Sequence, residues 1–376
     1  MIELRDLVHI YPNGVRAVNN LNLQINDSEI CVLIGPSGCG KSTTLNMLNK
    51  LIPVTSGEIM IDGHNIEEMV TTELRRNIGY AIQDVALFPH RTVAENIATV
   101  PALKRWSRQK INARVEELLD LMGLEPAQYR DKYPIQLSGG EQQRVGVARA
   151  LGANPPILLM DEPFGAIDPI TRARLQDEFL LIQEKIHKTI VFVTHDIHEA
   201  IKMGDKIAII NEGQLVQSGT PKDILQNPAN RFVEEFMGED RHMKWLQLIL
   251  AEEILEQQNM YCLQTDNYQA VLEKFKQSRL NSLPVVNADQ QLIGYVRANV
   301  LKNSKQPWDE KIKKYDEWID KKTTIYDALF ALMLDVNNYL PIVDKRGKYL
   351  GVITQDKVNA ILADIKNEVK EVEHVS

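Results

Sequence analysis

The sequence contains few cysteines and no long apolar segment. Only three cysteines occur in 376 residues, and their positions match neither a metal-binding pattern nor a disulfide framework, which predicts reduced, structural thiols. No run approaches the ~20 consecutive apolar residues of a membrane-spanning helix. The first residues, MIELRDLVHIY, lack the basic segment and apolar core of a signal peptide, so we expect the chain to stay in the cytoplasm.

An excess of positive charge is also missing. The formal net charge is −8 at pH 7, which gives no electrostatic reason to expect nucleic acid as a partner. Hydrophobic residues make up 44% of the chain and charged residues 25%, as in soluble globular proteins. The length exceeds that of one ordinary core and predicts two or three domains.

The chain does contain a glycine-rich stretch, Gly35–Ser42, with the pattern G-x-x-x-x-G-K-[ST]. An apolar run, Glu29–Ile34, precedes it, and leucines at helical spacing up to Leu51 follow, which predicts strand, loop and helix. Such a loop holds phosphate through backbone N–H groups, a lysine and a Mg²⁺-binding hydroxyl. The alternative is a chance match on a glycine-rich turn. The candidate phosphate-binding residues are Gly35, Pro36, Ser37, Gly38, Cys39, Gly40, Lys41, Ser42 and Thr43.

Polar side chains follow other buried strands, at the edge where open α/β sheets bind ligands. The apolar run Ile157–Met160 ends in Asp161 and Glu162. We assign Asp161, with Ser42, to a Mg²⁺ ion and Glu162 to polarisation of the attacking water, because phosphoryl transfer depends on positioning and charge neutralisation. Gln83 ends another strand and suits Mg²⁺ or the water, although a glutamine in this place is by itself ordinary surface.

Two more side chains acquire a role from this setting. His195 follows the buried strand Ile190–Val193, which favours contact with the γ phosphate over a purely structural role. Tyr11 precedes an Asn-Gly turn between two N-terminal strands. It either stacks on an adenine or covers the hairpin.

A second motif, LSGGEQQR, opens a helix downstream. Ser138 stands as its N-cap with Glu141 three residues later, which is the capping-box pattern. Gly139 and Gly140 leave N–H groups exposed at the helix start, so the motif is either only a well-capped helix or a second phosphate site.

Taken together, these motifs resemble the ATP-binding cassette (ABC) family over about residues 1–235. The phosphate loop, Gln83, LSGGEQQR, ILLMDEP, the segment Gly165–Asp168 and His195 occur in the order found in that family. The resemblance implies an α/β nucleotide-binding domain with a RecA-like mixed sheet, an antiparallel subdomain and a helical subdomain. It also implies ATP and Mg²⁺ as cofactors and Glu162, His195 and Gln83 as catalytic residues.

The same resemblance implies a head-to-tail homodimer. The phosphate loop of one copy and Ser138–Gly140 of the other would sandwich each ATP, Tyr11 would stack on adenine, and Asp168 would belong to the segment that communicates across the dimer. Since the chain holds one cassette and no membrane span, integral-membrane permease subunits and a substrate-binding protein or domain are implied as partners. The permease would contact residues 83–97, which places the protein at the cytoplasmic face of the membrane.

The last third of the chain repeats itself at a period of about 55 residues. The first copy contains Asn281–Asn287 and Leu292–Val296, and the second contains Asn338–Asp344 and Tyr349–Thr354. An amphipathic helix precedes each copy. The pattern looks like a tandem pair of CBS domains, an α/β module that commonly senses adenine nucleotides and pairs as dimers.

One position departs from the CBS pattern for ribose binding. A threonine or serine is usually followed three residues later by aspartate, whereas Thr354 is followed by Lys357. Two interpretations stay open: cyclic di-AMP or another adenine nucleotide held at a dimer interface with Tyr339 stacking on it, or a dimerisation and spacing module without a ligand.

The whole arrangement is similar to OpuCA-type ATPase subunits of importers for glycine betaine, carnitine and choline. We expect a nucleotide-binding domain at 1–235, a helical linker at 236–250, and CBS domains at 251–306 and 307–376, the latter including a tail. The resemblance implies an ATPase of a quaternary-amine importer. Alternatives are the ATPase of an importer for another small solute, such as an amino acid or related amine, and a nucleotide-sensing regulator without turnover.

Overall fold

The computed structural model describes residues 1–82, 86–165, 167–256, 260–278, 280–302, 307–315, 318–335 and 337–363. The chain divides into two compact units, Met1–Glu239 and Asp240–Ser376. This division falls within 236–250, the segment expected to be a linker. Among the described residues, none of the helices combines the length and apolar composition of a membrane span.

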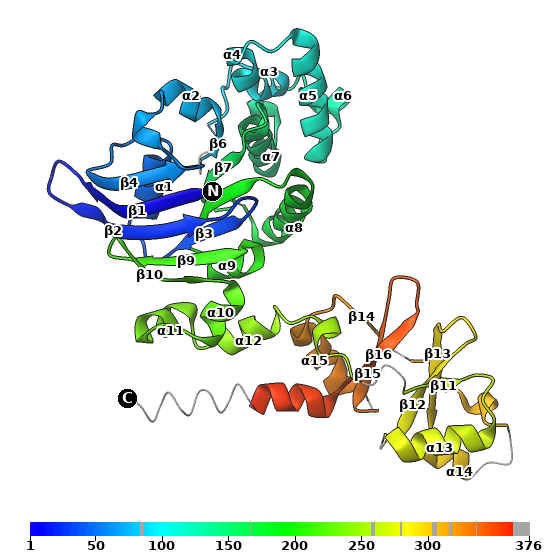
Figure 1. Ribbon diagram of the computed structural model, residues 1–376. Helices are drawn as coiled ribbons and strands as arrows, with labels where there is room; N and C mark the ends of the chain where they lie inside the picture. Colours follow the sequence, from blue (N-terminus) through cyan, green and yellow to red (C-terminus); the bar gives the residue numbers. More distant parts are fainter. Residues whose placement is uncertain are drawn as a thin grey trace. The chain divides into compact units, whose positions relative to one another are not determined.

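The first unit contains two sheets. A four-stranded antiparallel sheet has the order β2-β1-β4-β5, and a six-stranded sheet has the order β10-β9-β3-β8-β7-β6 (Figure 1). All neighbouring strands of the larger sheet pair in parallel except β10, which runs antiparallel to β9. The strands are β1 (Ile2–Ile10), β2 (Arg16–Ile25), β3 (Ile30–Ile34), β4 (Ser56–Ile61), β5 (His64–Asn65), β6 (Ile78–Ala81), β7 (Ile157–Asp161), β8 (Thr189–Val193), β9 (Lys206–Asn211) and β10 (Gln214–Gly219).

Central strands of the larger sheet are buried on both faces. Every residue of β3 and β8 is buried, as are the four aliphatic residues of β7, which is typical of parallel strands covered on two sides. One apolar core joins the two sheets and takes residues from β1, β2, β3, β7, β8 and α1, including Ile2, Leu21, Leu33, Leu45, Leu159 and Val191. This core fixes the carboxyl ends of β3, β7 and β8 side by side.

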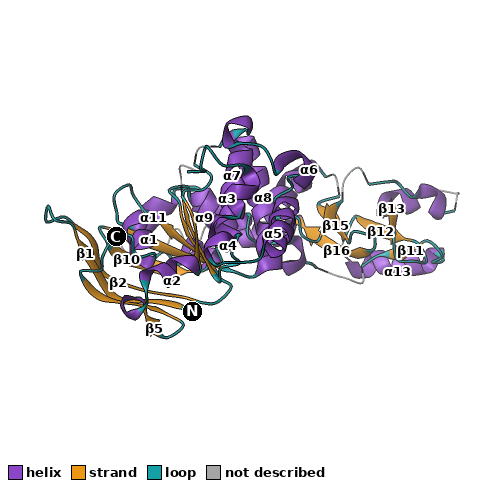
Figure 2. Ribbon diagram, turned by 90° about the horizontal axis from the view of Figure 1, so that it is seen from above, coloured by secondary structure: helices purple, strands orange, loops and turns teal. Residues whose placement is uncertain are grey.

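One group of helices in the first unit lies at an edge of the larger sheet. Helices α3 to α7 gather beside its β6–β7 side (Figure 1), and in the view of Figure 2 α8 lies among them. On α5, Val115, Leu118 and Leu119 are buried as the pattern predicts, and Gly123 follows with a positive φ. The α-helices are α1 (Lys41–Leu48), α2 (Thr71–Arg76), α3 (Val93–Ile97), α4 (Thr99–Leu103), α5 (Arg108–Leu121), α6 (Pro126–Tyr129), α7 (Gly139–Leu151), α8 (Pro169–Ile186), α9 (Ile197–Met203), α10 (Pro221–Gln226) and α11 (Arg231–Met237), with 3-10 turns at Ile66–Glu68 and Pro134–Gln136.

One helix is shorter than its apolar spacing predicts. α1 ends at Leu48, and Leu51, expected on its apolar face, is exposed. The turn after α1 lies outside the helix because Lys50 takes a positive φ, a conformation that α-helices do not contain. The helix therefore keeps only Leu45 and Leu48 of the three leucines in the core.

The second unit contains the two copies of the repeat. Each copy is a three-stranded sheet in which a short first strand runs parallel to the second and the third runs antiparallel to it. Gly294 and Gly351 occupy equivalent places in the two hairpins, and both hairpins shift register beside them. The elements are α12 (Arg241–Leu246), β11 (Cys262–Leu263), α13 (Tyr268–Ser278), β12 (Ser282–Val286), β13 (Leu292–Arg297), α14 (Ala298–Lys302), β14 (Ile319–Asp320), α15 (Ile325–Leu334), β15 (Tyr339–Val343) and β16 (Tyr349–Thr354), with 3-10 turns at Ala251–Glu253 and Asp309–Lys311.

Candidate functional site

The phosphate loop joins β3 to α1, as the sequence predicts. Gly40 is the N-cap of α1 with φ 104°, and no side chain caps the helix, so the first N–H groups of α1 are available to an anion. A Cβ on Gly40 would lie 2.2 Å from the carbonyl oxygen of Ala17, and one on Gly35 would lie 2.0 Å from that of Ile210. The loop therefore requires glycine at both positions, because the backbone approaches neighbouring strands too closely for a side chain.

Lys41 lies folded into this loop. Its Nζ donates hydrogen bonds to the carbonyl oxygens of Gly35, at 2.8 Å, and Pro36, at 2.9 Å. The side chain is buried, and Nζ also lies 3.7 Å from Sγ of Cys39. A buried ammonium group needs such partners, and the same group is the one expected to contact the β and γ phosphates.

Ser42 in the first turn of α1 and Asp161 at the end of β7 are in contact. The Ser42 hydroxyl donates to Oδ1 of Asp161 at 3.1 Å. Burial raises the pKa of Asp161 and the neighbouring Glu162 charge adds to this, while the Ser42 hydrogen bond and Lys41 oppose it. The partly buried carboxylate thus lies where a cation would relieve its desolvation.

This pair fits a magnesium ion that is held together with a nucleotide. Within the described ranges, no group of three or more His, Cys, Asp or Glu side chains could hold a metal ion. Mg²⁺ at phosphate-transfer sites usually takes one or two protein ligands and completes its shell with phosphate oxygens and water. A hydroxyl and a carboxylate in hydrogen-bond contact suit that mode.

Glu162 and His195 lie together beyond the ends of β7 and β8. The two strands pair in parallel with Asp161 opposite Val193, so the residues that follow emerge at the same edge. His195 Nδ1 lies 3.0 Å from Glu162 Oε1. Glu162 has a φ of 43°, a left-handed conformation that is uncommon outside glycine and concentrated at functional sites.

Tyr11 and the loop helix are neighbours. The Tyr11 side chain is 37% exposed, and its hydroxyl lies 3.2 Å from Oγ1 of Thr43. An aromatic ring that is half in solvent and adjacent to the phosphate loop is suitably placed to stack on a base. Its ring also contacts His9 edge-on, so the tyrosine covers its hairpin as well.

Ser138, Gly139 and Gly140 begin α7 and lie in a separate cavity. The Ser138 hydroxyl caps the helix and Glu141 completes the capping box, as predicted. The Tyr129 hydroxyl donates to Glu141 at 2.6 Å and lowers the pKa of that carboxyl. The cavity measures about 620 Å³ and is also lined by Gly123, Leu124, Arg144, Ile167, Asp168, Thr171, Arg174 and Glu178.

Asp168 thus lies beside the LSGGEQQR motif of its own chain. It is the N-cap of α8, where Oδ1 accepts from the backbone N–H of Thr171 at 3.1 Å. Backbone hydrogen bonds at this cap lower the pKa of the Asp168 carboxyl. Gln83, the third residue assigned to catalysis, lies outside the described residues.

The three cysteines are free and buried, as predicted. Burial raises the pKa of both Cys31 and Cys262 to about 12, which makes these thiols unreactive at neutral pH. Neither takes part in the site.

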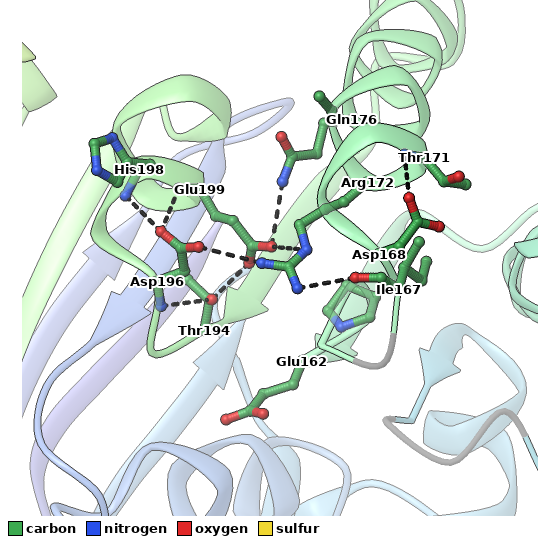
Figure 3. Close-up of polar contacts among 12 residues, drawn as sticks. Glu162, Ile167, Asp168, Thr171, Arg172, Gln176, Thr194, Asp196, His198 and Glu199 are labelled. Atoms are coloured by element: carbon green, nitrogen blue, oxygen red, sulfur yellow. Dashed lines mark hydrogen bonds and ion pairs between the residues drawn. The ribbon is translucent and has the colours of Figure 1, made fainter.

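A group of charged residues near Glu162 and His195 has no clear signature in the sequence. Figure 3 shows Arg172 and Gln176 of α8 facing Asp196 and Glu199 around the N-terminus of α9. The available signal was weak: Asp196 caps α9 with Glu199 three residues later. Charged residues on two amphipathic helices usually face solvent, so nothing in the pattern showed that they meet.

The second unit has a cavity of its own, of about 470 Å³, between the two copies of the repeat. Asn281, Asn337, Thr354 and Lys357 line it with Glu256, Ser278, Leu280, Asn338, Gln355, Asp356 and Ala360. The Thr354 hydroxyl donates to Glu256 Oε2 at 2.6 Å. The ribose-binding pattern is therefore replaced here by a threonine that is paired with glutamate.

The expectation that Tyr339 stacks on a ligand is wrong for this conformation. Its side chain is fully buried, and its hydroxyl lies 2.8 Å from that of Tyr315. Tyr339 lies on β15, the central strand of its sheet, in which all five residues are buried. A buried ring presents no face to a ligand.

Comparison with known proteins agrees with this geometry. The ABC transporter family model matches residues 18–165, and the CBS domain model matches residues 251–300 and 314–364. The chain is 42% identical to the choline transport ATP-binding protein OpuBA of Bacillus subtilis, with 97% of each chain covered. It is 41% identical to the osmoprotectant import ATP-binding protein OsmV of Salmonella typhimurium, with 95% of each chain covered.

Among solved structures, the chain resembles the dimeric ABC transporter cassette MJ0796. The TM-score is 0.53 at 36% identity, and the match covers 58% of this chain and 98% of that one. A second structure of MJ0796 is a dimer bound to ADP and Pi after hydrolysis. The ABC fold, the tandem CBS repeat and the full-length similarity lead to one conclusion: the chain belongs to the ABC transporter family, among its ATP-binding subunits with C-terminal CBS domains.

Proposed function

We propose that this protein is the ATP-hydrolysing subunit of an importer for quaternary ammonium osmoprotectants such as glycine betaine, carnitine and choline. The observation that carries the proposal is the meeting of Lys41, Ser42, Asp161, Glu162 and His195 at one sheet edge in a chain similar over nearly its full length to transport ATPases for these solutes.

Each side chain at the edge has a chemical task. Lys41 exchanges its bonds to the Gly35 and Pro36 carbonyls for bonds to the β and γ phosphates. Ser42 and Asp161 would hold Mg²⁺, which would supply positive charge to neutralise the phosphates. Glu162 orients and polarises the attacking water, because the reaction needs a positioned nucleophile more than a strong base.

The remaining residues complete the site. His195, held by Glu162, contacts the γ phosphate, and Tyr11 stacks on adenine. Gln83 joins the Mg²⁺ shell or positions the water. Ser138, Gly139 and Gly140 close on the ATP of a second copy of the chain, because they line a cavity with Asp168 that includes no residue of the phosphate loop of their own chain.

The permease partner binds near residues 87–97, at the cytoplasmic face of the membrane. The buried Asn96 braces this segment: its amide donates to the backbone carbonyls of Phe88, Arg91 and Thr92, and its Oδ1 accepts from the Phe88 N–H. The Phe88 ring stays 38% exposed on this rigid turn. An exposed aromatic on a fixed backbone is a suitable anchor for a partner.

Reconstitution of the protein with its permease and binding subunits in vesicles tests the transport assignment. We expect ATP-dependent uptake of radiolabelled glycine betaine, carnitine or choline, inhibited by unlabelled quaternary amines and not by ordinary amino acids. A parallel vesicle preparation with Glu162→Gln controls for leakage. Uptake of an amino acid with no quaternary-amine uptake would overturn the substrate class, and ATP binding without turnover or uptake would indicate a sensor.

We further propose that the CBS module regulates transport by binding an adenine nucleotide, such as cyclic di-AMP, in the cavity lined by Asn281, Asn337, Thr354 and Lys357. Lys357 supplies a positive charge for phosphate where the usual pattern has aspartate. Calorimetry of the full chain with cyclic di-AMP, AMP and ATP tests this, with Lys357→Glu as the variant. Lys41→Ala removes nucleotide binding at the phosphate loop, so binding heat that persists in this variant and disappears in Lys357→Glu comes from the CBS cavity and supports the proposal. Absence of such heat in the full chain indicates a spacing module.

A further inference from the structure

A buried carboxylate lies close to the segment that carries His195. Glu199, on α9, is 4% exposed. Its Oε2 accepts a hydrogen bond from the Thr194 hydroxyl at 2.6 Å, and its Oε1 accepts one from Gln176 Nε2 at 3.2 Å. Because Thr194 immediately precedes His195, Glu199 fixes the backbone that carries the histidine.

Arg172 extends this group to the Asp168 segment. Its Nη2 donates to the carbonyl oxygen of Ile167 at 3.0 Å, and its Nη1 lies 3.4 Å from Oδ2 of Asp196. One guanidinium group therefore contacts the residue before Asp168 and the residue after His195, as Figure 3 shows. A planar, forked donor can make both contacts at once, which a lysine cannot.

One contact in the group is incomplete. The Nε of Arg172 is buried and has no hydrogen-bond partner among the residues that the structure describes, and it lies 3.9 Å from Glu199 Oε1. A buried donor without a hydrogen bond is costly, so the ion pair with Glu199 is the contact that compensates Nε of Arg172. Burial raises the pKa of Glu199, which agrees with a carboxylate that lacks part of its compensation.

We propose that Arg172 and Glu199 are positioning residues that tie the Asp168 segment to the His195 segment of the same chain. In the proposed head-to-tail dimer, on which this inference rests, the first segment serves one ATP site and the second serves the other. Arg172 and Glu199 make the Asp168 segment and the His195 segment move together. When the dimer closes around the ATP next to the Asp168 segment, His195 is therefore placed correctly for hydrolysis at the other ATP site.

The test measures steady-state ATP hydrolysis of the assembled transporter with Arg172→Lys, which keeps the charge but removes the forked donor, and Glu199→Gln, which keeps the shape but removes the charge. We expect kcat to fall about 10- to 100-fold, while KM for ATP changes less than about threefold, because neither side chain contacts the nucleotide and positioning errors of this kind act on the chemical step. The melting temperature and ATP affinity of each variant show whether the fold is intact.

A matched control comes from the same two helices. Lys202 on α9 also contacts α8, through Asp177 at 2.7 Å and the Ala173 carbonyl at 3.2 Å, but on the exposed side. Lys202→Ala should leave kcat unchanged. An equal loss of kcat in this variant would mean that any tether between the helices suffices, and it would overturn the specific role of Arg172 and Glu199.

The double variant Arg172→Lys/Glu199→Gln decides whether the two residues act together. If the two residues are coupled, the kcat of the double variant equals that of the worse single variant. A fold-loss equal to the product of the two single fold-losses overturns the coupling. Unchanged kcat in both single variants overturns the inference alone. Absence of ATP hydrolysis in the wild-type transporter overturns the proposed function and this inference with it.

Discussion

His195 Nδ1 lies 3.0 Å from Glu162 Oε1, although the two residues come from different strands. The histidine is 66% exposed and the glutamate 21%, so the pair lies at the surface of the protein rather than in the core. This contact holds the carboxylate in one orientation through Oε1, and within the described ranges no hydrogen bond to Oε2 competes with water.

Replacement of Glu162 by glutamine tests that arrangement. Glu162→Gln keeps the shape but removes the negative charge, so we expect retained ATP binding, a stable closed dimer and a kcat lower by about 10²-fold or more. ATP hydrolysis and size-exclusion chromatography with ATP measure these outcomes. Glu184→Gln, an exposed position of α8, should behave as wild type, and substantial turnover in Glu162→Gln would contradict the role assigned to Glu162.

The proposed ATP site shared between two copies of the chain leads to a second prediction, which concerns Gly139. A Cβ at this position meets no atom within 4 Å in the single chain, so Gly139→Ala should fold normally and bind ATP as a monomer. We expect loss of cooperative dimerisation and of turnover, because the added methyl group meets the phosphates held by the partner chain. Lys41→Ala should instead lose nucleotide binding itself. Fluorescent ATP titration separates the two, and equal ATP affinity of both variants would argue against a shared site.

The raised pKa of Asp161 predicts a pH-dependent stability difference. Since the folded state favours the protonated carboxyl more than the unfolded state does, ionisation of Asp161 lowers stability as pH rises from its ordinary value, 3.8, through the raised one. Asp161→Asn should therefore melt higher at pH 7 without nucleotide, by on the order of 2 °C, and the difference should vanish below about pH 4.

The same variant should gain little from magnesium and ATP, whereas these ligands should raise the melting temperature of the wild type. Differential scanning fluorimetry across pH measures both effects. A melting temperature of Asp161→Asn equal to or below that of the wild type at pH 7 would show that burial of the charge carries no cost.

The close approach at Gly40 predicts a large stability effect. Gly40→Ala places a methyl group 2.2 Å from a backbone oxygen at a φ of 104°, so the loop or the hairpin must shift. Gly63, with φ 78° and open space around it, is the matched control for backbone strain alone. We expect Gly63→Ala to cost about 1 kcal/mol and Gly40→Ala about 3 kcal/mol or more in urea unfolding; equal midpoints would contradict the steric argument.

Much of the site was predictable because parallel strands deliver their carboxyl ends to one edge. The apolar runs before Gly35, Asp161 and Thr194 identified three such strands, and the pairing of β3, β7 and β8 confirmed them as neighbours. Other features depend on tertiary contacts with no local pattern. The burial of Tyr339, the end of α1 before Leu51 and the meeting of Arg172 with Glu199 belong to this class.

The bonds of Lys41 to the Gly35 and Pro36 carbonyls also bear on which nucleotides the protein recognises. A nucleotide breaks these hydrogen bonds only if its own oxygens bind the Lys41 ammonium group at least as strongly as the two carbonyl oxygens do. Adenosine and AMP have no β or γ phosphate with which to do so, whereas ATP offers several charged oxygens. These two hydrogen bonds therefore favour the triphosphate over adenosine and AMP.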